Sequence, residues 1–288
     1  MNFIKRVFSP VTAVLSFIQK YFKSLIFLVI LFLIFGAPSG ESIKPSNLMK
    51  IELNGPIFDS ERFLSNIKEA EKSNIKGVLM VVNSPGGAVA PSIEMALAVK
   101  RLKKKKPVVA YAGGIMASGS YYASIYANKI IANPGAMIGS IGVIFQSANI
   151  KELATKLGIK EQTVKAGKFK QIGTPTREWT DFERAELKRM IDDTYDMFVT
   201  DVATARGLDI NKSSQYADAH VFTARNAKKV GLIDEVGSIY DAKKEIEKLS
   251  GVTFPLWKKK DKIDKFMDKF ITESASKVAG FFYGVMAY

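Results

Sequence analysis

Four short apolar runs, separated by turns and helical segments, constrain the fold of this 288-residue chain more than any other feature. Continuous apolar strands of this kind are typical of a parallel sheet that is buried on both faces. The runs are GVLMVV (77–82), PVVAYA (107–112), KIIANP (129–134) and MIGSIGVIF (137–145). An alternating, strand-like segment precedes them from residue 49, and helical composition is found at 60–74, 91–102, 120–127 and 181–206. This alternation predicts an α/β fold with right-handed crossovers.

Composition narrows the chemistry that the chain can perform. Its hydrophobic fraction of 47% is sufficient for a packed core. The chain has no cysteine and a single histidine, His220. Zinc sites, iron–sulfur clusters and dithiol pairs are built from these residue types, so we expect no metal site and no cofactor.

The N-terminal region predicts a membrane anchor. Residues 24–40 carry no charge and contain an unbroken apolar run over 25–35, with Lys20 and Lys23 just before it. The basic segment 1–23 is therefore expected to stay cytoplasmic, and the chain after the anchor to lie on the far side of the membrane. Residues 37–39 form a poor cleavage site, so an uncleaved signal anchor is favoured over a cleaved signal peptide. A linker (41–48), a folded domain (49–250) and a C-terminal tail (251–288) follow.

The net charge of +14 suggests contact with an anionic partner. Lysine runs lie at 100–106 and 258–260, and the first follows a predicted helix and precedes Pro107. We interpret that run as a solvated helix C-terminus, with anionic lipid as an alternative partner. No nucleic-acid-binding motif accompanies the charge, so no nucleic-acid partner is expected. The basic, aromatic tail fits an amphipathic element on a membrane, a segment docked on another subunit, or an ordinary helix.

A serine at a glycine-rich strand end is the candidate reactive group. Ser118 lies in GGIMASGSYYAS (113–124), between a predicted strand and a predicted helix, where reactive groups gather in α/β folds. Helix capping would also explain a serine there. Gly119 and the glycines of NSPGG (83–87) can bring backbone N–H groups close to a substrate oxygen. Both interpretations remain open on the residues alone.

A serine hydroxyl needs a base to become a good nucleophile. His220 could serve in principle, but no carboxylate partner is evident for it at a fixed spacing. A lysine is the other common base, provided that burial lowers its pKa from about 10.4 by roughly 3 units. Residues 164–175 (VKAGKFKQIGTP) contain Lys165, Lys168 and Lys170 without any acid. The sequence does not choose among the three, and a loop of solvated lysines is the plain alternative.

Five segments in order resemble the signal peptide peptidase A family, in its short, membrane-anchored bacterial form. The resemblance covers residues 49 to about 245, and each segment would be weak alone. The family resemblance implies an α/β spiral of βα units like those of Clp protease and crotonase, and an assembly of eight subunits. The segments are NSPGG (83–87), MASGSYY (116–122), GSIGVI (139–144), the KxGxxK run (165–170) and AHVFTARNAKKVGLIDEVG (219–237).

The resemblance also implies roles for individual residues. It makes Ser118 the nucleophile, Lys170 the general base and Ser140 the residue that orients the lysine amine. The backbone N–H groups of Gly87 and Gly119 would form the oxyanion hole.

This sequence departs from the family pattern at Ser120, where a second glycine is usual, and at Ala224, where TGR is more usual than TAR. The first departure creates a rival serine. Ser118 is preferred because it holds the motif position and is followed by a glycine N–H.

The implied function is hydrolysis of remnant signal peptides through an acyl-enzyme, by a membrane-anchored homo-oligomer with its peptidase domain outside the cytoplasm. Apolar peptides and the membrane are the expected partners. The alternatives are a crotonase-type acyl-CoA enzyme, which a location away from cytosolic coenzyme A disfavours, and a non-catalytic membrane scaffold of the same fold.

Overall fold

A computed structural model describes residues 16–28 and 45–259 of the chain. The chain divides into two units, Met1–Pro45 and Ser46–Tyr288. In the first unit, residues 16–28 form a helix. None of the described helices is both long enough and apolar enough to cross a bilayer. Most of the predicted anchor (29–40), the first part of the basic segment and the tail from residue 260 lie outside the described residues.

The second unit is built on a sheet of seven strands within the described residues. Its main path has the order β1-β2-β3-β4-β7 and is parallel throughout. The end of β3 also pairs in parallel with β5, and β6 is antiparallel to β5. The strands are β1 (Leu48–Asn54), β2 (Gly77–Ser84), β3 (Val108–Ala117), β4 (Lys129–Ala132), β5 (Met137–Gly139), β6 (Val221–Thr223) and β7 (Glu235–Val236).

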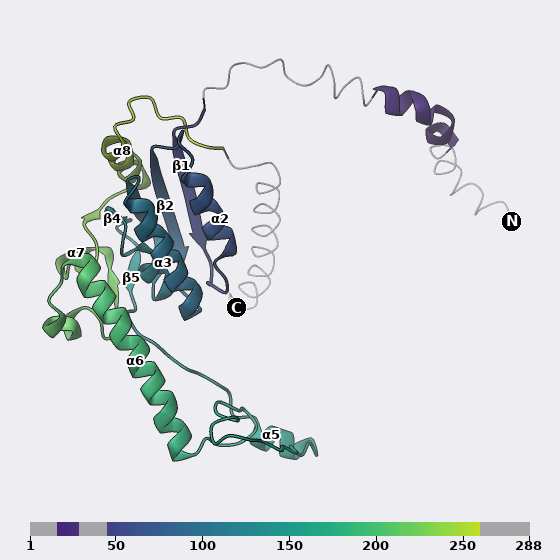
Figure 1. Cartoon of the computed structure of the whole chain (residues 1–288), viewed down its shortest axis with the longest axis vertical. Helices are drawn as coiled ribbons and strands as arrows, with labels where there is room; N and C mark the ends of the chain where they lie inside the picture. Colours follow the sequence, from purple (N-terminus) through teal and green to yellow (C-terminus); the bar gives the residue numbers. More distant parts are fainter. Residues whose placement is uncertain (1–15, 29–44, 260–288) are drawn as a thin grey trace, which may run out of the picture. The chain divides into compact units, whose positions relative to one another are not determined.

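Helices cover both faces of this sheet (Figure 1). The larger apolar core lies between the sheet and α2, α3, α4 and the C-terminal part of α6, and α8 packs on the opposite face. The predicted α/β fold is confirmed. The helices are α2 (Glu61–Ala70), α3 (Val89–Lys103), α4 (Gly119–Ser124), α5 (Lys151–Lys156), α6 (Asp181–Arg206), α7 (Ala224–Lys229) and α8 (Ile239–Ser250), with a 3₁₀ helix over Ile210–Gln215.

The sequence predicted that the strand over 107–112 ends at the glycine pair that follows it, but β3 continues to Ala117, so that prediction is wrong. The pairing of β2 with β3 shifts register between Val82 and Ser84, and β3 changes neighbour from β4 to β5 beyond this point. The Asn83 side chain accepts a hydrogen bond from the Ile115 N–H at 3.1 Å. The glycine pair 113–114 therefore forms an irregularity inside a strand rather than its end, which is a common position for glycine in sheets.

The strand predicted over 137–145 is much shorter in the structure. Only Met137–Gly139 is a strand, because the chain then leaves the sheet and enters a projecting arm (Figure 1). We define the arm as residues 144–186, which include α5 and the first turns of α6. Of these residues, only Glu183 is buried. The arm thus has almost no core of its own.

Candidate active site

Residues with a strained backbone conformation lie around Ser118. Three non-glycine residues of the described chain have positive φ, namely Ser118 (51°), Ser140 (50°) and Ala219 (66°). Backbone hydrogen bonds connect them: the Ser118 N–H donates to the Gly139 oxygen and the Ser140 N–H to the His220 oxygen, each at 2.7 Å. Such conformations cost about 1–3 kcal/mol each and are concentrated at functional sites. The strain marks the ends of β3 and β5 as the candidate site.

Ser118 lines a small pocket with a volume of about 30 Å³. The serine is half-buried and precedes the first residue of α4, while Gly87 and Gly119 line the same pocket. Most of the remaining lining is apolar and comes from α3, α4, α6 and the segment after β5, with Val89, Ile93, Tyr122, Val143, Met197 and Phe198. The structure therefore brings three of the five predicted site residues together. A pocket of this lining suits a small apolar side chain.

The backbone of the two glycine turns is packed so closely that side chains are excluded. A Cβ at Gly87 would lie 2.1 Å from the Ile57 oxygen, and one at Gly119 would lie 2.1 Å from Ser92 Oγ. The same Gly119 Cβ position is 3.4 Å from the Gly87 nitrogen, so the two turns are in contact beside Ser118. Neither the Gly87 nor the Gly119 amide donates to another described residue. Two such N–H groups can stabilise a developing negative charge on a substrate oxygen.

The rival serine, Ser120, is fully buried. Its Oγ accepts a hydrogen bond from the Ala117 N–H at 2.9 Å and lies 2.7 Å from the Ser84 oxygen, to which it can donate. The first contact closes the β3–α4 turn, and the second holds this turn against the end of β2. The hydroxyl is thus committed to the structure of the turn, which supports the preference for Ser118.

A polar contact also links two of the helices that line the pocket, α4 and α6. Tyr122 packs against Phe198 with ring centroids 4.6 Å apart, and its hydroxyl donates to the Asp201 carboxylate on α6. Burial, assisted by this carboxylate, raises the pKa of Tyr122. The tyrosine therefore stays neutral and fixes α6 beside α4.

Ser140 and His220 lie next to each other through their backbones, at the end of β5 and just before β6. The interpretation that His220 lacks a carboxylate partner is wrong, because its Nδ1 contacts Asp218. This partner is only two residues away, and the sharp turn at Ala219 (φ 66°) brings the two side chains together. The hydrogen bond from His220 lowers the pKa of Asp218. His220 is exposed and does not line the Ser118 pocket.

Lys170 is not at this pocket in the single chain. It lies in the arm, in an irregular segment after Gly167, and its side chain is exposed. Lys168, in the same stretch, places its Nζ 4.7 Å from the centre of the Phe182 ring. The arm thus carries the candidate bases, while the serine and the two glycine amides belong to the body of the domain.

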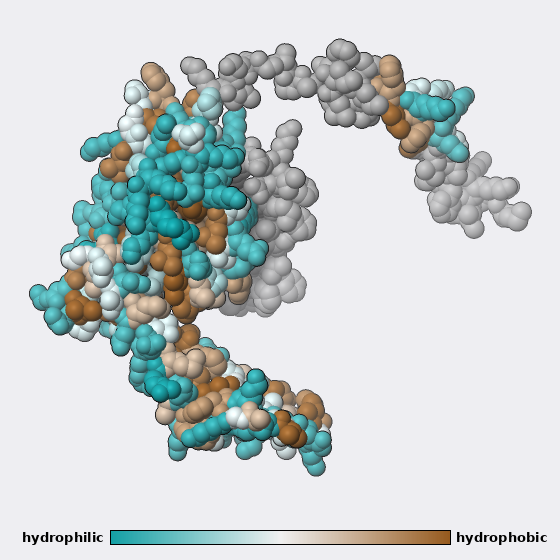
Figure 2. Space-filling view, viewed as in Figure 1, coloured by the Kyte–Doolittle hydropathy of each residue, from teal (hydrophilic) through white to brown (hydrophobic). Residues whose placement is uncertain are grey.

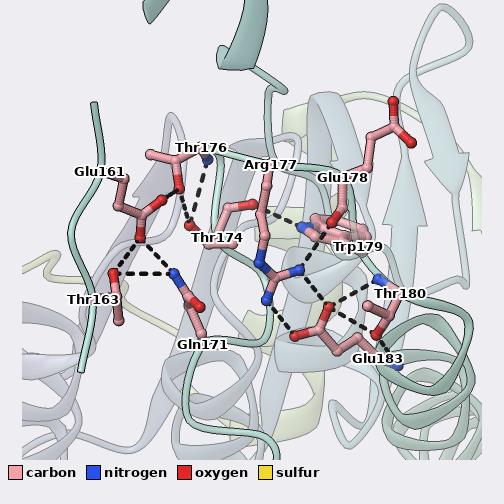
Figure 3. A network of polar contacts seen from close by, with 10 residues as sticks. All are labelled: Glu161, Thr163, Gln171, Thr174, Thr176, Arg177, Glu178, Trp179, Thr180 and Glu183. Carbon is pink, nitrogen blue, oxygen red and sulfur yellow. Dashed lines mark hydrogen bonds and ion pairs between the residues drawn. The ribbon is translucent and has the colours of Figure 1, made fainter. Parts of the chain in front are cut away.

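A polar network fastens the segment that follows Lys170 to the start of α6 (Figure 3). The Arg177 guanidinium donates to both oxygens of Glu183, at 2.7 and 2.8 Å. Glu183 also accepts from the Thr180 N–H at 2.9 Å, which completes a capping box at the helix N-terminus. The T-x-x-E pattern of residues 180–183 is the sequence signal that would have predicted this capping box.

This network predicts acid sensitivity of the arm. The ion pair with Arg177 lowers the pKa of Glu183 to about 2. The ionised Glu183 carboxylate therefore stabilises the folded arm, and this stabilisation is fully present at pH values above the unfolded pKa near 4.5. It is lost as the pH falls through the folded pKa of about 2. Trp179, whose Nε1 donates to the Thr174 oxygen, reports on the network. In a Trp257→Phe background, we expect its fluorescence to change over this acid range, and Glu183→Gln to abolish that titration. An unchanged titration in Glu183→Gln would contradict the assignment.

Comparison with known proteins identifies the family. Residues 100–253, more than half of the chain, match the model of peptidase family S49. A protein of Methanocaldococcus jannaschii, provisionally named a protease, is 45% identical over 198 residues, which are 68% of this chain and 64% of that protein. A signal peptide peptidase SppA of Enterococcus faecium, also provisionally named, is 31% identical over 228 residues, 74% of this chain and 66% of that protein. The matches thus span about two thirds of these relatives.

A solved structure supports the fold alone. A mutant of the membrane-bound stomatin-specific protease 1510-N superposes with a TM-score of 0.51 at 15% identity, covering 76% of this chain and all of that one. The chain belongs to peptidase family S49, and the resemblance to signal peptide peptidase A is confirmed.

Proposed function

We propose that this protein is a membrane-anchored serine endopeptidase in which Ser118 is the nucleophile and Lys170 the general base. The observation that carries the proposal is the strained Ser118 backbone, beside an apolar pocket and two amides that donate to no described residue. Membership of a peptidase family supports the class of reaction. The relation to the Clp protease and crotonase spiral belongs to the same proposal.

The chemistry is acyl transfer in two steps. The neutral Lys170 amine removes the Ser118 proton as Oγ attacks the peptide carbonyl, and the Gly87 and Gly119 N–H groups stabilise the oxyanion. The lysine then protonates the leaving amine, so that the C–N bond breaks and an acyl-enzyme remains. The same lysine then deprotonates a water molecule that attacks the acyl carbonyl, the bond to Ser118 Oγ breaks, and the lysine returns the proton to Oγ as the acid is released. Ser140 orients the lysine amine when the site is assembled.

We further propose that Lys170 reaches Ser118 from a neighbouring copy of the chain. The arm has one buried residue and exposes many apolar side chains, which Figure 2 shows as brown areas. Exposed apolar surface of this extent is typical of an interface. The octamer implied by the family resemblance would cover it. The exposed apolar residues of the arm include Ile144, Phe145, Leu153, Leu157, Ile159 and Val164.

The proposed substrates are signal peptides that remain in the membrane after secretion. The apolar lining of the Ser118 pocket fits such sequences, and an anchor over residues 24–40 would hold the enzyme where they accumulate. With the basic segment 1–23 in the cytoplasm, the peptidase domain would lie outside it. The domain boundaries 49–250 and the tail 251–288 belong to the same proposal.

A fluorophosphonate probe tests the nucleophile. We expect the probe to label the wild-type protein and Ser120→Ala, because the buried Ser120 hydroxyl is not accessible. Labelling should be absent from Ser118→Ala, since only an activated serine reacts. Labelling that persists in Ser118→Ala, or that disappears only in Ser120→Ala, would refute the assignment of Ser118.

A further inference from the structure

Lysines surround one end of the folded domain, the end at which β1 begins. Asn47 accepts a backbone hydrogen bond from Lys76 at 2.7 Å, and the Asn74 side chain donates to the Ser46 oxygen at 2.8 Å. In Figure 1 the start of β1, the end of α8 and the loop after it lie together at this upper end. We name it the basic end, and its lysines are Lys72, Lys76, Lys103, Lys104, Lys105, Lys106, Lys258 and Lys259.

The acids nearest to these lysines neutralise only some of them. Glu69 pairs with Lys72 and Lys258, and Glu71 pairs with Lys105. The Lys106 ammonium forms no ion pair with these acids and instead donates hydrogen bonds to the backbone oxygens of Ala70 and Lys72, at the end of α2. The remaining exposed lysines, Lys76, Lys103, Lys104 and Lys259, have no ion-pair partner among the described residues. The basic end therefore keeps a surplus of accessible positive charge.

Exposed apolar side chains accompany this charge. Phe254 is 82% exposed, and its backbone oxygen accepts from the Asn47 side chain at 2.9 Å, so it lies beside the start of β1. Leu249 and Leu256 are also exposed. Lysines around a protruding aromatic ring are the combination that binds an anionic bilayer, where the ring enters the head-group region and the ammonium groups contact phosphates. A nucleic-acid surface would not require the exposed leucines.

The position of the basic end along the chain favours the same partner. Only five residues separate Gly40, the end of the proposed anchor, from Ser46, which is therefore six residue steps away. An extended chain of that length spans about 20 Å, so Ser46 would stay within that distance of the bilayer. Electrostatic attraction to the head groups acts over a screening length of about 8 Å at physiological salt. A linker this short allows the lysines around Ser46 to come within that distance of the bilayer. We propose that the basic end is a docking surface for anionic phospholipid head groups and orients the domain on its membrane.

A fluorescence experiment on the full chain tests this surface. Because the chain has no cysteine, a single one introduced at the exposed Ser73 position carries a donor dye at the basic end, and Ala148→Cys carries it on the arm as the control. The protein is reconstituted into vesicles with acceptor-labelled lipid, made of phosphatidylcholine alone or with about a third phosphatidylglycerol. We expect energy transfer from Ser73→Cys at least to double with phosphatidylglycerol, and the gain to vanish at about 1 M salt.

Matched charge reversals complete the test. Lys76→Glu with Lys103→Glu and Lys104→Glu should abolish the gain, whereas Lys151→Glu with Lys156→Glu and Lys160→Glu, equal in charge but on the arm, should preserve it. Circular dichroism checks that both triple variants fold. An equal response in both vesicle types, or equal loss in both triple variants, would overturn the proposal. Binding of an oligonucleotide in neutral micelles, without a response to phosphatidylglycerol, would assign the surface to nucleic acid instead. The readout is position, so its failure leaves the peptidase proposal untouched.

Discussion

Replacing Lys170 with alanine is expected to lower kcat/KM for an apolar peptide by at least ~10³-fold, because Ser118 then has no base. Lys170→Arg should be equally inactive, since a guanidinium stays protonated.

The position of Lys170 on the arm predicts a second result, in mixed assemblies. If the base comes from a neighbouring subunit, an assembly of Lys170→Ala and Ser118→Ala chains mixed in equal amounts should recover about a quarter of the wild-type activity, because one interface in four pairs an intact serine with an intact lysine.

Two outcomes would contradict this expectation. Full activity of Lys170→Ala would show that another group is the base, and Lys165→Ala and Lys168→Ala, which change lysines of the same stretch, serve as matched controls that should stay active. A mixture that remains inactive, although the chains co-assemble, would mean that the serine and the lysine of one chain act together.

Replacing Gly87 with alanine is expected to lower kcat by about 10²–10³-fold, the usual cost of losing one oxyanion donor. The Cβ would lie 2.1 Å from the Ile57 oxygen, so the turn must move and displace its amide from beside Ser118. Gly135→Ala is the matched control, because its Cβ would meet nothing closer than 3.5 Å. Steady-state kinetics with thermal melting separates catalysis from stability. A folded Gly87→Ala protein with wild-type kcat would exclude this amide from the oxyanion hole.

Several elements of the fold were predictable because local pattern and tertiary structure agree. The helix over 181–206 was predicted with its observed bounds, since its apolar spacing continues to a C-terminal glycine. The strand end predicted after residue 112 was wrong for a physical reason: glycine is typical of both strand ends and strand irregularities, and only the pairing of β3 with β5 distinguishes them.

Some features of the candidate site were likewise predictable from the sequence, and others were not. Ser118 and the glycines of the two turns were predictable from the sequence because parallel strands end at one edge of a sheet, and their glycines are required by contacts as short as 2.1 Å. The Asp218–His220 contact and the burial of Ser120 were not, because both depend on backbone direction at single residues.

The amino-acid sequence by itself determined the alternation of strand and helix, the serine between glycines and the stretch of lysines without acids, since these are properties of residue type and local spacing. Only the tertiary structure decided which serine is accessible, that the two glycine amides converge beside it and that Lys170 lies on an arm away from it. Those outcomes depend on which strands pair and on which polar side chains are buried with a hydrogen-bond partner. Strand pairing and burial are both determined by contacts between residues that are distant in the chain.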